Sequence, residues 1–467
     1  MNIHVKPFCT PKGYYVYDRE TNSILEVTGD EFIAFLRIQE KSATKQDFEM
    51  LCKFQEKGFC MESKLKAIQH PQSDIAKYYL ENRIEKITLQ VTQNCNLRCS
   101  YCAYSDSYFQ RSHSNMVMTY DTMVRSVEFL MRHSSNSPTV DIGFYGGEPF
   151  LEFENIKKLV EYIMENYPFK EITYSITTNG TIFTDEIISF LEKNDFGVTI
   201  SIDGPREVHD KNRKFVDGTG SFDTIMKNLQ YIKERALEFY RRISFNTVLA
   251  PGNDHKCIND FYDASEMLED NQLFASTLSE FGSKEKIQYD ELFYISYNIQ
   301  RTKMLLAELG MISQEKIPKI VSQEMAFIAH TYDGLGRMYE LGGIAHPGGP
   351  CIPGAKRPMI DVNGAIFPCE RVSESSLAME IGHIDRGFDM DKVSAVLNIG
   401  QLTEDECINC WCFTHCSLCA AAADDSECLS RETKLKYCVG VENGALDKLI
   451  TICLLKENGY DFSELAR

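Results

Sequence analysis

The sequence predicts an α/β protein in which parallel strands are joined by helices, as in a full or partial barrel. Three observations support this fold class. Short apolar segments alternate with amphipathic ones from residue 84 onward, a pattern typical of strand–helix–strand units. A hairpin-and-helix pattern precedes them, and a cysteine-rich segment follows them. We therefore expect four parts, at residues 1–75, 84–310, 311–345 (a helical bridge) and 346–467.

The composition argues against several kinds of partner. Lys and Arg total 49 against 68 Asp and Glu, which gives a net charge of −19, and so acidic a surface repels nucleic-acid phosphates. No apolar run approaches the roughly 20 residues that span a bilayer, and residues 1–6 lack the apolar core of a signal peptide. We expect a cytoplasmic protein that binds neither nucleic acid nor a membrane.

The amino-terminal residues predict a small unit of their own. Two β-rich runs, at residues 14–18 and 24–27, flank a polar turn and indicate a hairpin. Thr28 followed by Glu31 is a capping-box pattern that opens a helix, and residues 46–56 form a second amphipathic stretch. An exposed strand edge in such a unit could take up an extended peptide as an added strand. The alternative is a generic cap on the central part.

The central part predicts six strands with helices between them. The expected strands are residues 84–91, 140–145, 171–177, 197–202, 243–249 and a less regular sixth near 273–278. The expected helices are residues 120–132, 154–165, 185–193 and 222–234, followed by a mostly helical segment at 285–342. Parallel strands place their carboxyl ends at one edge, where α/β folds carry their chemistry. Beyond the Gly- and Pro-rich stretch 342–350 the periodicity fades, as expected where a metal core replaces an apolar one.

Three closely spaced cysteines, Cys95, Cys99 and Cys102, follow directly after the first of these strands. In a reducing compartment such a pattern indicates metal binding or catalysis more often than disulfides. Three thiolates can hold three irons of a 4Fe-4S cluster and leave the fourth iron open to substrate or cofactor. A zinc site and a buried trio without metal are the alternatives.

Residues 95–102, with an aromatic residue just before the last cysteine, resemble the signature of the radical SAM superfamily. The resemblance implies that the open iron chelates S-adenosylmethionine (SAM) and that electron transfer yields a 5′-deoxyadenosyl radical, while a barrel positions the cofactor. Segment 201–213 is similar to that of anaerobic sulfatase maturases and peptide-modifying enzymes, and His209 within it is expected to be structural. The resemblance implies SAM contacts at Tyr101, Gly146, Gly147, Glu148, Asn179, Ser201, Asp203 and Arg213.

The cysteines between residues 351 and 438 resemble the SPASM extension, which carries two auxiliary 4Fe-4S clusters. The resemblance assigns three cysteines to the first cluster: Cys351, Cys369 and Cys419. It assigns four to the second: Cys407, Cys410, Cys416 and Cys438. One spacing is shorter than the usual pattern, and Cys412 and Cys428 are extra, so either of them, or His346, could complete the first cluster. Zinc ribbons are the rival interpretation of the paired cysteines.

Taken together, these resemblances imply a partial (βα)6 radical SAM barrel, an amino-terminal winged-helix-like peptide-recognition domain and a cysteine-rich SPASM iron–sulfur domain. The implied cofactors are SAM and three 4Fe-4S clusters. The implied activity is maturation of a ribosomally made, cysteine-rich precursor peptide with a leader, through thioether crosslinks, with flavodoxin or ferredoxin as electron donor. The alternatives are a maturase that oxidises Ser or Cys to formylglycine and a non-catalytic metal-binding scaffold. Glu370 and Arg371 could accept a proton and bind substrate, or simply be solvated charges.

Overall fold

A single ten-stranded sheet forms the centre of the computed structural model, which describes residues 3–105, 107–268, 270–336, 341–348 and 350–465. Six of its strands are parallel neighbours in the order β10-β9-β8-β7-β6-β5. Their bounds are β5 (Lys86–Thr92), β6 (Thr139–Gly146), β7 (Glu171–Thr178), β8 (Gly197–Ser201), β9 (Ser244–Leu249) and β10 (Leu273–Thr277). All six strands predicted from the sequence are confirmed, including the sixth.

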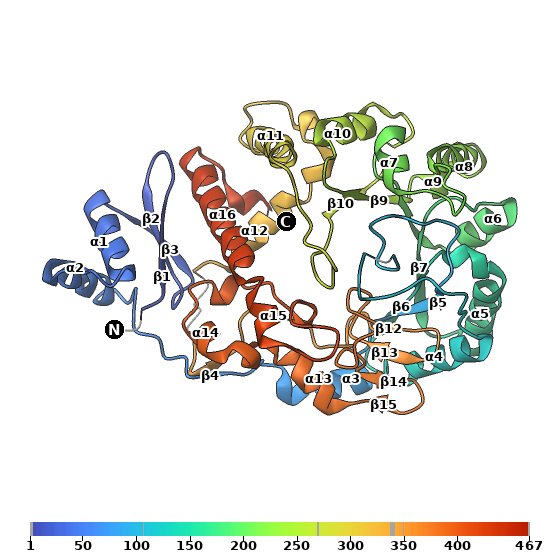
Figure 1. Ribbon diagram of the computed structural model, residues 1–467, viewed down its shortest axis with the longest axis horizontal. Coiled ribbons are helices and arrows are strands. Elements are labelled where there is room, and N and C mark those ends of the chain that lie inside the picture. Colours follow the sequence, from blue (N-terminus) through green and yellow to red (C-terminus); the bar gives the residue numbers. More distant parts are fainter. Residues whose placement is uncertain (1–2, 106, 269, 337–340, 349, 466–467) are drawn as a thin grey trace.

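Amphipathic helices cover the outer side of these strands (Figure 1). They are α4 (Tyr120–Arg132), α5 (Phe153–Asn166), α6 (Asp185–Lys193), α7 (Arg206–Asn212), α8 (Phe222–Arg235), α9 (Leu237–Tyr240) and α10 (His255–Ala264). Helix α4 begins where the Thr119 hydroxyl accepts from the amide of Thr122, and its Val127 and Leu130 are fully buried. Each such side chain contributes about 1.5–3 kcal/mol to stability through burial.

The cysteine-rich region extends the same sheet and has an apolar core. Strand β12 (Met359–Ile360) pairs in parallel with β5, so the cysteine-rich region continues the sheet beyond the first of the six parallel strands. Three more strands continue outward in antiparallel pairs: β13 (Ala365–Phe367), β14 (Gly382–His383) and β15 (Gly387–Phe388). The expectation that a metal core replaces the apolar one here is wrong, because Ile366, Val393 and Leu397 are fully buried in the main core. These strands are too short to show a sequence period.

The amino-terminal unit is an antiparallel sheet in the order β1-β2-β3, with two helices on one face. Its elements are β1 (Val5–Cys9), β2 (Tyr14–Asp18), β3 (Ser23–Val27), α1 (Gly29–Gln39) and α2 (Lys45–Gln55). The hairpin and the Thr28–Glu31 capping box are confirmed. Strand β1 was not predicted, because Pro7 interrupts the pattern; proline is tolerated there since β1 is an edge strand.

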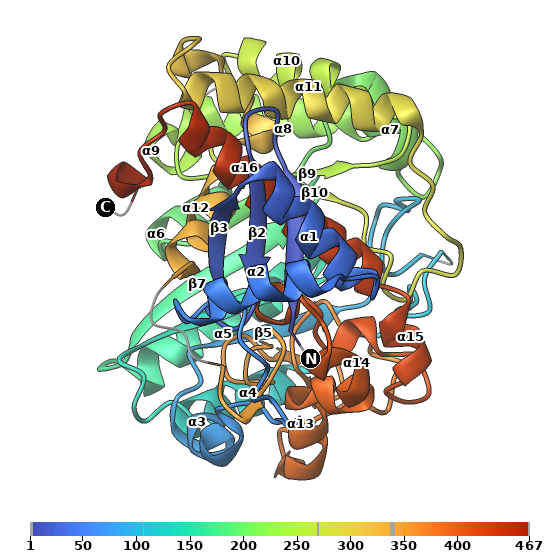
Figure 2. The same ribbon diagram turned by 90° about the vertical axis from the view of Figure 1, so that its left-hand side faces the viewer.

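The other face of this small sheet packs on the carboxyl-terminal helix α16 (Cys438–Glu457), which lies between it and the rest of the molecule (Figures 1 and 2). Tyr17 from β2 and Leu449 from α16 meet in that apolar contact. The fully buried Arg19 donates to the backbone carbonyls of Ile408 and Cys410 at 2.6 and 3.1 Å. The amino-terminal unit is therefore docked on the cysteine-rich region.

The remaining helices connect these parts. They are α3 (Ala76–Asn82), α11 (Glu291–Glu308), α12 (Glu324–Gly334), α13 (Met390–Leu397), α14 (Glu404–Ile408) and α15 (Arg431–Leu435), with β4 (Ala67–Ile68) paired to β11 (Ile344–Ala345). Short 3-10 helices are η1 (Ser73–Ile75), η2 (Pro149–Glu152), η3 (Gln314–Lys316), η4 (Lys319–Val321), η5 (Ile399–Thr403), η6 (Phe413–His415), η7 (Ala420–Ala422) and η8 (Phe462–Leu465). Of the helices in the described ranges, none is long and apolar enough to cross a bilayer.

Candidate functional site

Cys95, Cys99 and Cys102 lie together on the loop that leaves the carboxyl end of β5. The sulfur of Cys95 accepts from the amide of Leu97 at 3.4 Å, and that of Cys102 accepts from the amide of Tyr104 at 3.5 Å. Burial raises the pKa of Cys95 to about 12, and the neighbouring Glu148, Cys99 and Cys102 add to the rise, while the Leu97 amide opposes it. Three thiols, two of them with backbone donors, therefore lie together at the strand end predicted for them.

Gly146 and Gly147 allow the end of β6 to lie directly against the segment that leads into this loop. The amide of Gly147 donates to the Thr92 carbonyl at 2.8 Å. A Cβ atom on Gly147 would stand 2.0 Å from the Asn94 carbonyl oxygen, and one on Gly146 would stand 2.2 Å from that of Thr92. No side chain larger than hydrogen fits at either position, so the glycine pair sets the position of the cysteine loop.

Glu148, the next residue, is fully buried and bonded to the end of β7. Its carboxylate accepts from the Thr178 hydroxyl and the Asn179 amide, both at 2.8 Å, and from the Phe150 amide at 3.1 Å. Burial raises its pKa to about 7, against the effect of these donors. Binding of the SAM ammonium by Glu148 stays a prediction, because in this structure all three donors to the carboxylate come from the chain.

Asn179 and Ser201 end β7 and β8, as the strand pattern predicted. The side-chain nitrogen of Asn179, Nδ2, donates to Asn96 Oδ1 at 2.8 Å and lies 3.7 Å from the Cys95 sulfur. Ser201 is 8% exposed at the end of its strand. Asn179 is thus next to the first cysteine. Ser201 is placed near the site only by its position as the last residue of β8.

Asp203, Arg213 and Tyr101 form a buried cluster beside Cys99. One Asp203 oxygen accepts from Arg213 Nε at 3.0 Å and from the Tyr101 hydroxyl, and the other accepts from the Val248 amide at 3.1 Å. The Arg213 guanidinium lies 5.4 Å from the centre of the Tyr101 ring. Burial raises the pKa of Cys99 to about 11, and the charge of Arg213 opposes that rise. Three of the predicted residues therefore meet at the cysteine loop.

His209 supports this cluster from behind. Its Nδ1 accepts from the Asp203 amide at 3.2 Å, which leaves Nε2–H to donate to the Ser221 hydroxyl at 2.9 Å. Burial lowers its pKa to about 4. His209 is a neutral structural histidine, as expected.

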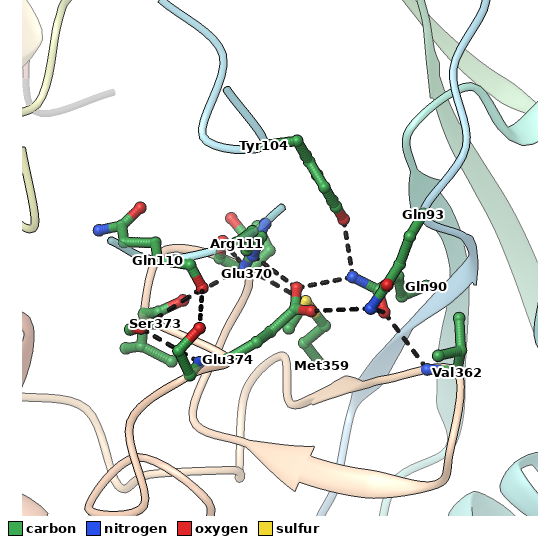
Figure 3. Close-up of polar contacts among 12 residues, drawn as sticks. Gln90, Gln93, Tyr104, Gln110, Arg111, Met359, Val362, Glu370, Ser373 and Glu374 are labelled. Carbon is green, nitrogen blue, oxygen red and sulfur yellow. Dashed lines mark hydrogen bonds and ion pairs between the residues drawn. The ribbon is translucent and has the colours of Figure 1, made fainter. Parts of the chain in front are cut away.

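A buried polar network that the sequence did not reveal joins the first cysteine loop to the cysteine-rich region (Figure 3). Arg111 pairs with Glu374 at 2.5 Å, and both side chains are less than 10% exposed. Arg111 also donates to the Glu370 carbonyl at 2.6 Å, and Gln90 donates to Glu374 at 2.6 Å and to the Tyr104 hydroxyl at 2.7 Å. The partners are far apart along the chain, so no local spacing could have predicted the contact.

Glu370 differs from its neighbour Arg371, which is exposed. One carboxylate oxygen of Glu370 pairs with Arg357 at 3.1 Å. The other, Oε2, is buried and accepts no hydrogen bond from the part of the chain described. Glu370 interacts electrostatically with Tyr145 at the end of β6. It is therefore an unsatisfied carboxylate next to Cys369, whereas Arg371 is the solvated charge.

The cysteines of the carboxyl-terminal region fall into two groups. Cys351 and Cys369 both interact electrostatically with Cys419. The second group combines the remaining predicted ligands, with mutual interactions among Cys407, Cys410, Cys416 and Cys438. Burial raises the pKa of Cys369 to about 11 and that of Cys410 to about 12. The two groups contain the cysteines that the resemblance assigns to the two auxiliary clusters, and the binding of a cluster by either group stays a prediction.

The candidate extra ligands are placed differently. Cys412 is buried beside Cys410 and Cys416 of the second group, whereas Cys428 is exposed and donates to Asp425 at 3.6 Å. Both ring nitrogens of His346 contact backbone: Nε2 accepts from the Gly400 amide at 2.8 Å, and Nδ1 lies 3.0 Å from the Pro347 carbonyl. His346 is therefore wrong as a candidate for completing the first group.

These donor sets suit iron–sulfur clusters. In the described ranges, no three His, Cys, Asp or Glu side chains converge on the position of one metal ion. A 4Fe-4S cluster does not need that convergence, because its cysteine thiolates bind different irons. Buried thiols accompanied by amide donors, as at Cys95 and Cys102, are the environment that such clusters take.

Comparisons with known proteins agree with this geometry. Residues 89–264 match the model of the radical SAM superfamily. The chain is 28% identical over 231 residues to the radical SAM cyclopropyl synthase TigE of Paramaledivibacter caminithermalis, which covers 47% of each protein. It is 32% identical over 152 residues to a cysteine-type anaerobic sulfatase-maturating enzyme of Clostridium novyi, which covers 32% of this chain and 40% of the relative. The chain thus spans half or less of the length of these curated relatives.

The solved structure of native anSMEcpe with bound AdoMet shares the fold. The TM-score is 0.56 at 19% identity, and the match covers 79% of this chain and 98% of that one. The cysteine-rich carboxyl-terminal region fits a SPASM-like domain. The cysteine loop, the glycine motif, the parallel strands and the match of residues 89–264 together show that this part of the chain is a radical SAM domain.

Proposed function

We propose that this protein is a SAM-dependent maturase of peptides and that Cys95, Cys99 and Cys102 hold its SAM-binding 4Fe-4S cluster. The observation that carries the proposal is the grouping of these three thiols on the loop after β5, against the backbone of Gly147 and beside Asn179. When bound, the cluster and SAM supply a 5′-deoxyadenosyl radical that abstracts a hydrogen atom from the substrate.

The chain's own residues position this site and keep it dry. Gly147 admits the cysteine loop to the end of β6, and Glu148 fixes the ends of β6 and β7 to each other. Asp203 holds Tyr101 and Arg213 in one orientation. Because these groups are buried and already paired, little reorganisation is needed when the cofactor binds.

For the substrate, we propose a ribosomally made precursor peptide in which a cysteine sulfur is joined to a carbon. The substrate carbon gives up a hydrogen atom, the thiol gives up a proton, and one electron leaves as the C–S bond forms. Cys351, Cys369 and Cys419 are the proposed ligands of the auxiliary cluster nearest to this step. As a set of three thiols, they leave room for a substrate thiolate.

The proton and the electron both need acceptors. Glu370 Oε2, which is buried and unsatisfied next to Cys369, is the proposed proton acceptor, since it could take the thiol proton without losing a bond of its own. We propose Cys407, Cys410, Cys416 and Cys438 as ligands of the second auxiliary cluster. A flavodoxin- or ferredoxin-like donor would exchange the electron with the clusters.

The amino-terminal unit is the proposed docking site for a leader peptide. Strand β3 lies at the edge of the sheet, with Ile24 and Leu25 partly exposed, and an extended peptide could pair with it as a fourth strand. The contact of the same unit with α16 favours the alternative, a structural cap. Leader binding to a Glu26→Pro variant separates the two, because the backbone N–H of Glu26 points away from β2 and proline removes this donor from the free edge.

The central test is an anaerobic assay of 5′-deoxyadenosine with reconstituted protein, SAM and a reductant. The unaltered protein is expected to bind iron and sulfide and to cleave SAM, and the Cys95→Ala/Cys99→Ala/Cys102→Ala variant is expected to release none. Release of 5′-deoxyadenosine by the triple variant would refute the central claim. Bound zinc without cleavage would instead support a metal-binding scaffold.

A second candidate is oxidation of Ser or Cys to formylglycine, favoured by the identity to the Clostridium novyi sulfatase-maturating enzyme. Mass spectrometry of a peptide incubated with the protein distinguishes the products. A thioether consumes a thiol and leaves no aldehyde, whereas formylglycine reacts with hydrazides. The name of TigE, a cyclopropyl synthase, makes carbon–carbon bonds a third product to look for.

A further inference from the structure

Lys434 is a buried cation in the cysteine-rich region. It lies on α15 and is 2% exposed. Its ammonium donates to the Thr403 hydroxyl at 2.5 Å and to the Cys407 sulfur at 3.8 Å. Across the ranges that the structure describes, it forms no ion pair with a carboxylate.

The carboxylates nearby have other partners. Glu406 pairs with Arg431, Glu404 accepts from the Ile68 amide at 2.7 Å, and Glu442 lies 3.7 Å from the Cys410 sulfur. None of these contacts neutralises Lys434.

An uncompensated buried charge costs several kcal/mol, and a hydroxyl with a neutral thiol does not offset that cost. Apart from Thr403 and His346, the groups that interact with Lys434 are cysteines. Besides its contact with Cys407, it interacts electrostatically with Cys416 and Cys438. The compensating negative charge must therefore reside on these sulfurs, as it does when thiolates bind an iron–sulfur cluster.

We infer that Lys434 is the internal counter-ion of the second auxiliary cluster and raises the reduction potential of that cluster. The inference rests on the proposed assignment of Cys407, Cys410, Cys416 and Cys438 to one cluster. A fixed positive charge favours the reduced form, which carries one more negative charge, and hydrogen bonds to the sulfurs act in the same direction.

Thr403 contacts both Lys434 and the Cys407 sulfur. Its hydroxyl lies 3.2 Å from the Cys407 sulfur while accepting from Lys434. Accepting from the ammonium leaves its own hydrogen to point at the sulfur. The pair thus presents two donors to one ligand, and Lys434 acts on the electron carrier rather than on the substrate.

The test measures the potentials of the auxiliary clusters alone. The Cys95→Ala/Cys99→Ala/Cys102→Ala background leaves only these clusters to be reduced. After anaerobic reconstitution and counting of iron and sulfide, a redox titration monitored by electron paramagnetic resonance gives each midpoint. Lys434→Met is expected to lower the ratio of reduced to oxidised cluster about tenfold at a fixed potential, or about 59 mV for one electron, in one cluster only.

Three variants complete the design. Lys436→Met removes an exposed lysine from the same segment and should leave both midpoints unchanged. Lys434→Arg should retain most of the potential, and Thr403→Val should lower it by less than Lys434→Met does. If Lys434→Met loses its iron, a fall in the Thr403→Val midpoint supports the inference, and an unchanged midpoint refutes it.

The failure modes can be told apart. Clusters present in full, with midpoints unmoved by Lys434→Met or moved equally by Lys436→Met, would overturn the inference and leave the proposed function standing. A background protein that takes up no iron and sulfide would overturn the inference together with the proposed auxiliary clusters, because Lys434 would then have no cluster to balance. SAM cleavage by the unaltered protein would still support the proposed site at Cys95, Cys99 and Cys102.

Discussion

The carboxylate of Glu148 accepts from the Thr178 hydroxyl and from two backbone amides inside the core. Glutamine keeps the shape of the side chain, but its NH2 group replaces one carboxylate oxygen. This donor then faces the N–H or O–H donor that the oxygen had bonded. We expect Glu148→Gln to lower the free energy of unfolding by about 1–3 kcal/mol. If that loss carries into the transition state, release of 5′-deoxyadenosine slows about 5- to 150-fold.

Urea unfolding and the product assay measure these two effects. Glu154→Gln, an exposed residue on α5, is the matched control and should change neither. Equal behaviour of the two variants would mean that the bonds of Glu148 do not hold the strand ends together.

His209 gives the fold a pH dependence of predictable sign. Its pKa is about 4 in the fold and about 6.5 in the unfolded chain. The unfolded chain binds more protons between these values, so its contribution to stability is complete above about pH 6.5 and falls as the pH drops. We expect about 2 kcal/mol of this contribution to be lost between pH 6.5 and 5.

Comparing urea unfolding of the unaltered protein with that of His209→Asn isolates the effect, because asparagine does not titrate in this range. The variant should be less stable at pH 7.5 and should lose less stability on acidification. Parallel curves would show that His209 is not held neutral.

At the scale of elements, the sequence pattern predicted those helices and strands whose formation depends on local sequence. Most of the barrel strands are short apolar runs, and helices such as α4 and α6 have a clear 3.6-residue pattern. Strands β12 to β15 are two or three residues long and exist because they pair with β5 and with one another. Their stability is a long-range property, so no local signal could have predicted them.

The position of the cysteine loop depends on the absence of a Cβ atom at Gly147, just after β6. A Cβ on Gly147 would meet the Asn94 carbonyl oxygen at 2.0 Å, so Gly147→Ala must push the cysteine loop away. We expect this variant to lose most of its SAM cleavage and part of its iron, because a displacement of about 1 Å in a positioned site can cost 100-fold in rate. Iron content and 5′-deoxyadenosine yield measure both.

Gly440→Ala is the control for this substitution, since a Cβ there meets nothing within 4 Å and lies in helix α16. It should stabilise the helix by about 0.5–1 kcal/mol and leave cleavage unchanged. Full activity in Gly147→Ala would show that the cysteine loop tolerates the displacement.

At the scale of the whole molecule, the Arg111–Glu374 pair ties the first cysteine loop to the cysteine-rich region. Removing one partner of a buried pair leaves an uncompensated charge, so Arg111→Met should cost about 3–5 kcal/mol. The Arg111→Met/Glu374→Met double variant should recover much of that loss. The solvated pair Arg206–Asp223 is the control, and Arg206→Met should cost about 0–1 kcal/mol.

Urea unfolding of the unaltered protein, the two Arg111 variants and Arg206→Met measures these differences in stability. A double variant less stable than Arg111→Met alone would indicate that Glu374 is held by other groups, such as Gln90, rather than by Arg111.

The site divides in the same way between what is local and what is global. The cysteine motifs, Gly146–Glu148 and Asn179 were identified by their resemblance to known motifs, and Cys95, Gly146–Glu148 and Asn179 also lie at or near the ends of predicted strands. The Arg111–Glu374 network and the Lys434–Cys407 contact were not, since their partners come from separate segments. Spacing predicts donor atoms, while burial and counter-charges emerge only when the chain is folded.

The pairing of β12 with β5 also bears on how the protein can be dissected. Strand β5 lies between β6 and β12, so a fragment that ends before residue 359 would leave one side of this apolar strand without hydrogen-bond partners. Such an edge recruits strands from other molecules, and the isolated barrel is expected to aggregate as it is made. A soluble catalytic core would therefore have to keep the cysteine-rich segment, because β12 of that segment covers the open edge of β5.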